Sequence, residues 1–187
     1  MDIGSGCSEL PNLLMQRAEQ NSQQLILIDS EEMHALLPAS ATTQKLAARF
    51  PDCPQLFESY TGKIDAILTY SVLQYVFAEG NVYEFLDKSL ALLAPLGRVL
   101  IGDIPNISMR KRFFASDTGK QHHREFTGKD EDPVVAFNTV EHENIDDSVV
   151  LALAARARAS GFHAFIVPQS PDLPMANRRE DLLIIKP

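Results

Sequence analysis

The sequence has no tryptophan, few cysteines and no apolar run of the length that crosses a bilayer. Its two cysteines, Cys7 and Cys53, are far apart and belong to no Cys-x-x-Cys or zinc-ligand pattern. We therefore expect neither a metal site nor a disulfide framework. No signal-peptide pattern is present, and a reduced, cytoplasmic protein is the default expectation.

Positive charge is also scarce, since 17 Lys and Arg face 25 Asp and Glu, for a net charge of −8. Nucleic acids and anionic membranes repel an acidic protein, so we expect neither as a partner. The length of 187 residues and the hydrophobic content of 45% suit one domain with a substantial core. The sequence thus predicts a single domain over 1–187.

Apolar segments alternate with segments of helical periodicity along most of the chain. Strands are predicted at 25–28, 55–58, 64–70, 98–103, 162–167 and 182–185. Helices are predicted at 8–20, 42–50, 82–94 and 146–160, and Ser30 resembles a helix cap. The last two strands have no helix between them. We therefore expect a three-layer Rossmann-like α/β fold, with a mostly parallel central sheet and an antiparallel last strand.

Residues 105–145 interrupt this alternation and show no clear periodicity. A connection of this length is usually functional, so we expect an irregular insertion on the substrate side. Between Ser108 and Arg124 it contains five basic residues that could bind an anionic acceptor, namely Arg110, Lys111, Arg112, Lys120 and Arg124. The stretch that follows Arg124, through Asp147, is strongly acidic. The basic and acidic halves of this segment could instead pair with each other. His122 or His123 could serve as a general base, because imidazole titrates near neutrality.

Three further features lie at the ends of successive predicted strands, where open α/β sheets bind ligands. The segment Asp2-Ile3-Gly4-Ser5-Gly6 predicts a tight turn, because glycine lets the backbone bend closely against a ligand. Asp29 ends the next strand and could accept hydrogen bonds from ribose hydroxyls. Tyr70 and Ser71 begin the turn after the strand at 64–70.

In order and spacing these features resemble the class I (Rossmann-like) S-adenosylmethionine-dependent methyltransferases, over nearly the whole chain. The first motif is similar to Asp/Glu-x-Gly-x-Gly-x-Gly, with Ser8 at the third glycine. Segments 71–76 and 94–101 resemble the family's sequences after strand four and before strand five. The resemblance implies methyl transfer from S-adenosylmethionine to O or N of a small molecule. Cofactor-binding residues would be Asp2, Gly4, Gly6, Asp29, Tyr70 and Ser71, and catalytic candidates are His122, His123 and Tyr70.

Only Met1 precedes Asp2, whereas the family has a longer first strand and N-terminal helices over the cofactor. We therefore expect a truncated first strand and N-terminal lid. This leaves open a non-catalytic, methyltransferase-like module that binds a partner or scaffolds a larger enzyme. An NAD(P)-dependent reductase is the second alternative, which the missing third glycine disfavours.

Overall fold

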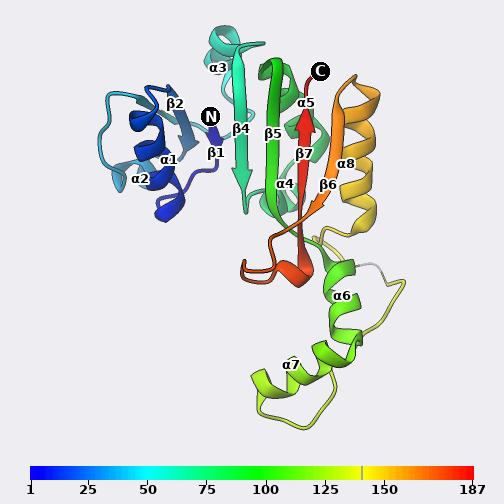
Figure 1. Cartoon of the computed structure of the whole chain (residues 1–187). Coiled ribbons are helices and arrows are strands. Elements are labelled where there is room, and N and C mark those ends of the chain that lie inside the picture. The colour runs from blue at the N-terminus through cyan, green and yellow to red at the C-terminus, as the bar shows by residue number, and fades with distance from the viewer. Residues whose placement is uncertain (140) are drawn as a thin grey trace.

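The computed structural model describes residues 1–139 and 141–187 and contains a seven-stranded sheet (Figure 1). Its strands are β1 (Asp2–Ile3), β2 (Leu25–Asp29), β3 (Thr43–Ala47), β4 (Ile64–Tyr70), β5 (Leu93–Pro105), β6 (His163–Pro168) and β7 (Arg179–Ile185). The helices are α1 (Glu9–Gln20), α2 (Glu31–Ala35), α3 (Pro54–Tyr60), α4 (Leu73–Glu79), α5 (Val82–Leu92), α6 (Ile107–Ala115), α7 (Asp117–Thr127), α8 (Asp147–Ala159) and the short 3-10 helix η1 (Ala176–Arg178). None of these described helices is both long and apolar enough to span a membrane.

The strand order is β3-β2-β1-β4-β5-β7-β6. Neighbouring strands from β3 to β5 are parallel, and β7 runs antiparallel to both β5 and β6. The prediction of a mostly parallel α/β sheet with a reversed last strand is therefore confirmed. The reversal follows from the connection between β6 and β7, which contains only η1 and returns the chain beside the strand it has just left.

The main core lies between one face of the sheet and helices α3, α5 and α8. Phe85 and Leu86 of α5 and Leu153 of α8 are almost fully buried there with Ile28 of β2. The alternate residue Leu27 points to the other face and packs with α1. Because β2 is buried on both faces, its sequence is continuously apolar rather than alternating. Each such side chain contributes roughly 1.5–3 kcal/mol of burial free energy.

The other face of the sheet is less covered. In Figure 1, α1 lies beside β2, and none of the described helices lies in front of β4, β5, β7 and β6. Residues of β2 and β4 line a cavity of about 850 Å³ next to Met1. Leu68, Leu100 and Leu183 line this cavity.

Two predicted elements have the wrong type. The segment predicted as a helix at 42–50 forms the edge strand β3, which pairs in parallel with β2 from Thr43 to Ala47. Pairing with the sheet overrides the helix propensity of its Gln, Lys, Leu and Ala residues. The segment predicted as a strand at 55–58 lies in α3, where Pro54 occupies the first turn.

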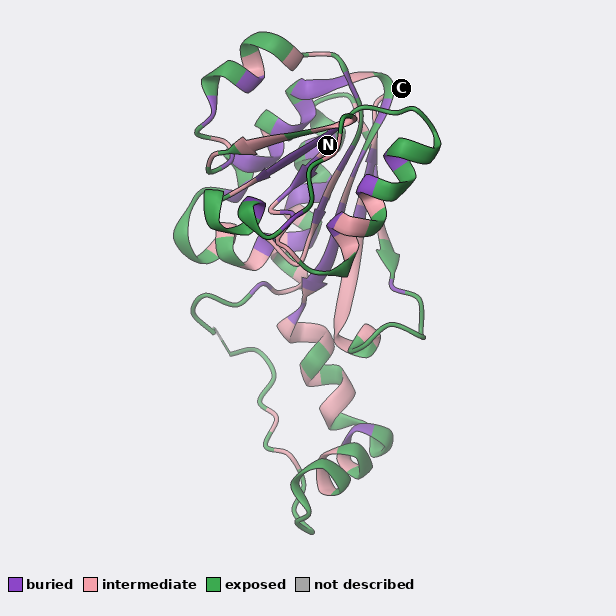
Figure 2. Cartoon of the chain, turned by 90° about the vertical axis from the view of Figure 1, so that its left-hand side faces the viewer, coloured by how far each residue is buried: buried purple, intermediate pink, exposed green. Residues whose placement is uncertain are grey.

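The expectation of an irregular insertion at 105–145 is also wrong in its first half, which forms α6 and α7. Asn106 and Ser116 cap these helices with their side-chain oxygens, and Gly128 ends α7 in the left-handed conformation. Both helices project from the sheet as an arm that carries mostly exposed or half-buried residues (Figures 1 and 2). Position 140 of this segment lies outside the described residues.

Candidate functional site

The glycine turn after β1 packs against the first turn of α4. Gly4 has a φ of +71°, and a Cβ built on it would lie only 2.5 Å from Cγ2 of Val72. Its N–H donates to the carbonyl of Ile28 at 2.8 Å, which holds the turn against β2. Both the backbone conformation and the close approach therefore require glycine at this position.

Asp29 lies side by side with this turn at the carboxyl end of β2. The Gly6 N–H donates to Oδ2 of Asp29 at 2.7 Å, and the Ser30 N–H donates to Oδ1 at 2.7 Å. A carboxylate oxygen has two lone pairs, so each retains capacity for another donor. The two features that the sequence singled out thus meet at one edge of the sheet.

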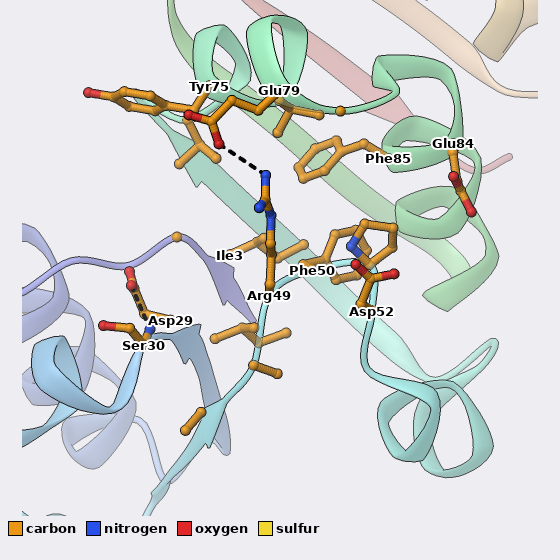
Figure 3. Close-up of a pocket in the computed structure, with 18 of the residues that line it drawn as sticks. Ile3, Asp29, Ser30, Arg49, Phe50, Asp52, Tyr75, Glu79, Glu84 and Phe85 are labelled. Atoms are coloured by element: carbon orange, nitrogen blue, oxygen red, sulfur yellow. Dashed lines mark hydrogen bonds and ion pairs between the residues drawn. The ribbon is translucent and has the colours of Figure 1, made fainter.

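A pocket of about 950 Å³ opens beside this junction (Figure 3). Ile3 and Gly4 of the turn and Asp29 of β2 form one side. The loop at 49–52 after β3 and the residues of α4 from Tyr75 to Glu79 form the others. This volume lies within the range of small-molecule and cofactor sites.

The pocket is lined by more acidic than basic side chains. Six carboxylates line it: Asp29, Glu31, Glu32, Asp52, Glu79 and Glu84. Arg49 is the one basic residue among the lining residues, and it pairs with Glu79 at 3.1 Å across the pocket (Figure 3). No three His, Cys, Asp or Glu side chains of the described residues are placed to hold a metal ion. The charge of the lining favours a cationic ligand.

Asp2 directly precedes Ile3, which lines this pocket, but Asp2 itself does not line it. Its carboxyl group is buried, and Oδ2 has no hydrogen-bond partner among the described residues. Burial raises the pKa of Asp2 to about 6, the Met1 ammonium opposes the rise, and the nearby Asp29 adds to it. A buried carboxyl with an unused oxygen is a ready partner for a cation.

Tyr70 and Ser71, at the end of β4, join a polar cluster that sequence reasoning missed. The Ser71 hydroxyl donates to Oδ2 of Asp103, and the same oxygen pairs with Arg179. Ser71 and Asp103 both have positive φ values, +60° and +59°, although neither is glycine. Such strain at the ends of adjacent strands is typical of functional sites.

Asp103 is held from several sides at once. Its N–H donates to Oδ1 of Asp181 at 2.8 Å, and Nε2 of Gln169 donates to the same Asp181 oxygen at 3.0 Å. The pKa of the neighbouring Tyr70 is raised, first by burial and then by the charges of Asp103 and Asp181. Because these residues come from distant segments, no local pattern in the sequence could reveal the cluster.

His122 and His123 lie on α7, out on the arm, and neither lines the pocket beside Asp29. The ring of His122 packs against Phe113 and Phe126. His123 lines a separate cavity of about 300 Å³ between the arm helices and the chain that follows them. The structure therefore does not bring the predicted general bases to the predicted cofactor residues.

The basic residues of the arm are mostly paired with acids. Lys111 contacts Glu141 at 2.7 Å, and Arg112 contacts Asp147 at 2.6 Å. Two further pairs join α7 to the acidic stretch, namely Lys120–Asp132 and Arg124–Asp132. The alternative that the two halves of this segment neutralise each other is confirmed for these four cations, and Arg110 is the exception.

The strand order, the glycine turn after β1 and the carboxylate of Asp29 at the end of β2 together define a Rossmann-like methyltransferase fold. No protein-family model matches the chain, and no curated protein matches it by sequence. Solved structures do match. The plantazolicin methyltransferase BpumL in complex with SAH is 16% identical with a TM-score of 0.63, over 99% of this chain and 74% of that one.

Two other structures extend the likeness. The CMeT domain of the citrinin polyketide synthase is 12% identical with a TM-score of 0.60, over 98% of this chain and 45% of that one. The methyltransferase domain of bacterial CtHen1 is 13% identical with a TM-score of 0.59, over 100% of this chain and 88% of that one. At these identities the similarity establishes the fold that the sequence predicted, and function rests on the site.

Proposed function

We propose that this protein binds S-adenosylmethionine in the pocket beside Asp29 and transfers its methyl group to O or N of a small molecule. One observation carries the proposal. The glycine turn and Asp29 are hydrogen-bonded to each other, 2.7 Å apart, at the edge of a pocket of about 950 Å³. This junction lies in a methyltransferase fold, at the carboxyl ends of the strands, where such sheets bind ligands.

The residues present fit this cofactor. Asp29 has lone pairs left for the ribose hydroxyls. In the glycine turn, Gly6 has no described atom within 4 Å of the position of a Cβ, which leaves room for the methionine part. The unused Oδ2 of Asp2 suits the ammonium group, directly or through water. When bound, S-adenosylmethionine supplies a methyl group already activated by the sulfonium, so the protein contributes mainly proximity and orientation.

The chain's own residues then position the acceptor. Tyr70 and Ser71 lie at the end of β4, next to the turn that follows β1. Since its pKa is raised, Tyr70 remains a phenol at neutral pH and can donate a hydrogen bond rather than accept a proton. For His122 or His123 to act as a base, the arm would have to approach the pocket.

The two alternatives are less well supported. A dinucleotide carries a pyrophosphate, and six carboxylates in the pocket lining would repel it. A non-catalytic binding module would not need an open pocket next to a strained polar cluster at the end of β4. Both alternatives nevertheless make distinct predictions for ligand binding.

Calorimetric titration with S-adenosylmethionine, its demethylated product SAH, and NADPH separates the three functions. We expect the first two to bind and NADPH not to bind. Asp29→Ala should weaken the binding of S-adenosylmethionine and of SAH by about 1–3 kcal/mol, because the ribose hydroxyls lose their hydrogen-bond acceptor. Asp65→Ala, which removes an exposed acid at the amino end of β4, is the matched control and should change little. Binding of NADPH alone would support the reductase, and binding of none would support the non-catalytic module.

A further inference from the structure

A further pocket, of about 320 Å³, lies at the end of β5 between α6, η1 and the first turn of α4. Gln74 of α4 lines it, whereas Val72 and Tyr75 of the same turn line the pocket beside Asp29. The two pockets therefore flank one helical turn. This places the smaller pocket next to the proposed cofactor site.

Two arginines of this pocket share one aromatic ring. The guanidinium groups of Arg110 and Arg178 lie 5.4 Å and 5.6 Å from the ring centroid of Phe114. Neither side chain has an ion pair or a hydrogen bond with any residue that the structure describes. Nε of Arg178 is buried and without a partner. Two neighbouring cations that form no ion pair with a described residue repel each other, and the resulting cost falls when an anion binds.

A rigid framework holds these arginines in place. Asn106 is 1% exposed, caps α6 with Oδ1, and donates through Nδ2 to Asp147 and Glu180. Its backbone N–H donates to the carbonyl of Arg178 at 3.1 Å, which ties η1 to the start of α6. The two arginines therefore project from elements joined at one buried residue. Preorganised groups of this kind bind ligands with a smaller entropic cost.

We propose that Arg110 and Arg178 form a binding site for an oxyanion, a carboxylate or a phosphate, carried by the methyl acceptor. Guanidinium groups recognise both anions through paired N–H donors. The other basic residues of the arm are paired with acids, and Arg179, which also lines the pocket, pairs with Asp103. Glu143 lines the pocket too, but makes no ion pair with a described residue.

The anion site is inferred only from the pocket of about 320 Å³ that Arg110 and Arg178 line, called here the arginine pocket. Its assignment to a methyl acceptor rests on the proposed function. Inorganic phosphate and benzoate test the two possible anions, and neutral benzamide controls for the aromatic ring. We would follow the Nε–H resonances of the arginines by NMR during each titration. We expect saturable shifts of Arg178 and Arg110 with phosphate or benzoate and none with benzamide.

Variants then test the assignment to these two residues. Arg178→Gln or Arg110→Gln should weaken anion binding at least tenfold. Arg124→Gln, which removes the same charge elsewhere on the arm, should not weaken it. Equal losses in all three variants would mean general charge attraction and would overturn the proposal. Absence of any shift in the unaltered protein would also overturn it, whether or not the variants fold.

Titration of the same samples with SAH distinguishes this failure from failure of the proposed function. We expect Arg178→Gln to retain the SAH affinity of the unaltered protein, because Arg178 does not line the pocket beside Asp29. If the anion binds but SAH does not, the proposed function fails and the anion site remains. If SAH binds but the anion does not, the anion site fails alone.

Discussion

The two pockets on either side of the first turn of α4 have opposite charge. The larger one is lined by six carboxylates and one arginine that is already paired with Glu79. The smaller one is lined by three arginines and one carboxylate, with Arg110 and Arg178 lacking any described partner. The net charge of −8 does not reveal this difference between the pockets, because it is a sum over the whole chain.

Under the proposed function, this difference in charge lets one edge of the sheet hold two unlike ligands. S-adenosylmethionine carries a net positive charge, so the carboxylate-lined pocket attracts it. An anionic acceptor is repelled there and attracted to the arginine pocket. Charge would then assign each ligand to its own side of α4 before any specific contact forms.

The largest effect should come from a change that damages one pocket and spares the other. Gly4→Ala places a methyl group against Val72 and forces an L-residue into a φ of +71°. We expect a loss of about 3 kcal/mol in the free energy of unfolding, from backbone strain and the clash together. SAH binding should fall with it, whereas phosphate binding at the arginines should persist.

Gly62→Ala is the matched control, because Gly62 has a φ of +72° but open space around the added methyl group. It should cost only the backbone strain, about 1–2 kcal/mol. Denaturant unfolding of both variants measures the difference. Equal losses would show that the packing of the glycine turn on Val72 is unimportant.

A second comparison uses pH. The pKa of Asp2 in the folded protein is raised from 3.8 to about 6, so its ionisation is disfavoured by folding. Its contribution to the free energy of unfolding is present below pH 4 and is lost as pH rises through 6. A bound ammonium favours the ionised form, so S-adenosylmethionine should bind about tenfold more weakly at pH 5 than at pH 7.

Calorimetry at both pH values checks this, with Asp2→Asn as the variant in which the dependence disappears. Benzoate stays ionised over this interval, and its binding at Arg110 and Arg178 should not change. If Asp2→Asn keeps the full pH dependence, another group is responsible and Asp2 has no part in cofactor binding.

The smallest effect concerns the ion pair across the larger pocket. Arg49 and Glu79 are 69% and 62% exposed, so the pair itself contributes little to stability. Arg49→Gln nevertheless removes the positive charge from this pocket. The affinity for S-adenosylmethionine relative to neutral SAH should rise about two- to fivefold, within the energy of one surface charge pair. Arg49→Lys keeps the charge and should leave the ratio unchanged.

The body of the fold was predictable because its pattern reflects burial. The run from Leu25 to Asp29 and the stripe on α5 face a core, and the structure confirms both elements. The end-of-strand positions of the glycine turn and Asp29 were predictable for the same reason. The edge strand β3 was not, because its residues are half-exposed and its type depends on pairing with β2.

The arm and the arginine pocket were harder to predict. Helix α6 has no buried residue, so hydrophobic periodicity could not reveal it, although the cap at Asn106 was a usable signal. The pocket joins Arg110 to Arg178, which are far apart in the chain. Their meeting depends on Asn106 holding α6 to η1, a contact that no local pattern encodes.

The most direct test of the account is amide chemical-shift mapping of the protein during titration with SAH. The Gly6 and Ser30 N–H resonances, which report on the two oxygens of Asp29, should be among the most strongly shifted. Shifts confined to other parts of the molecule, with these two amides unchanged at saturation, would contradict it.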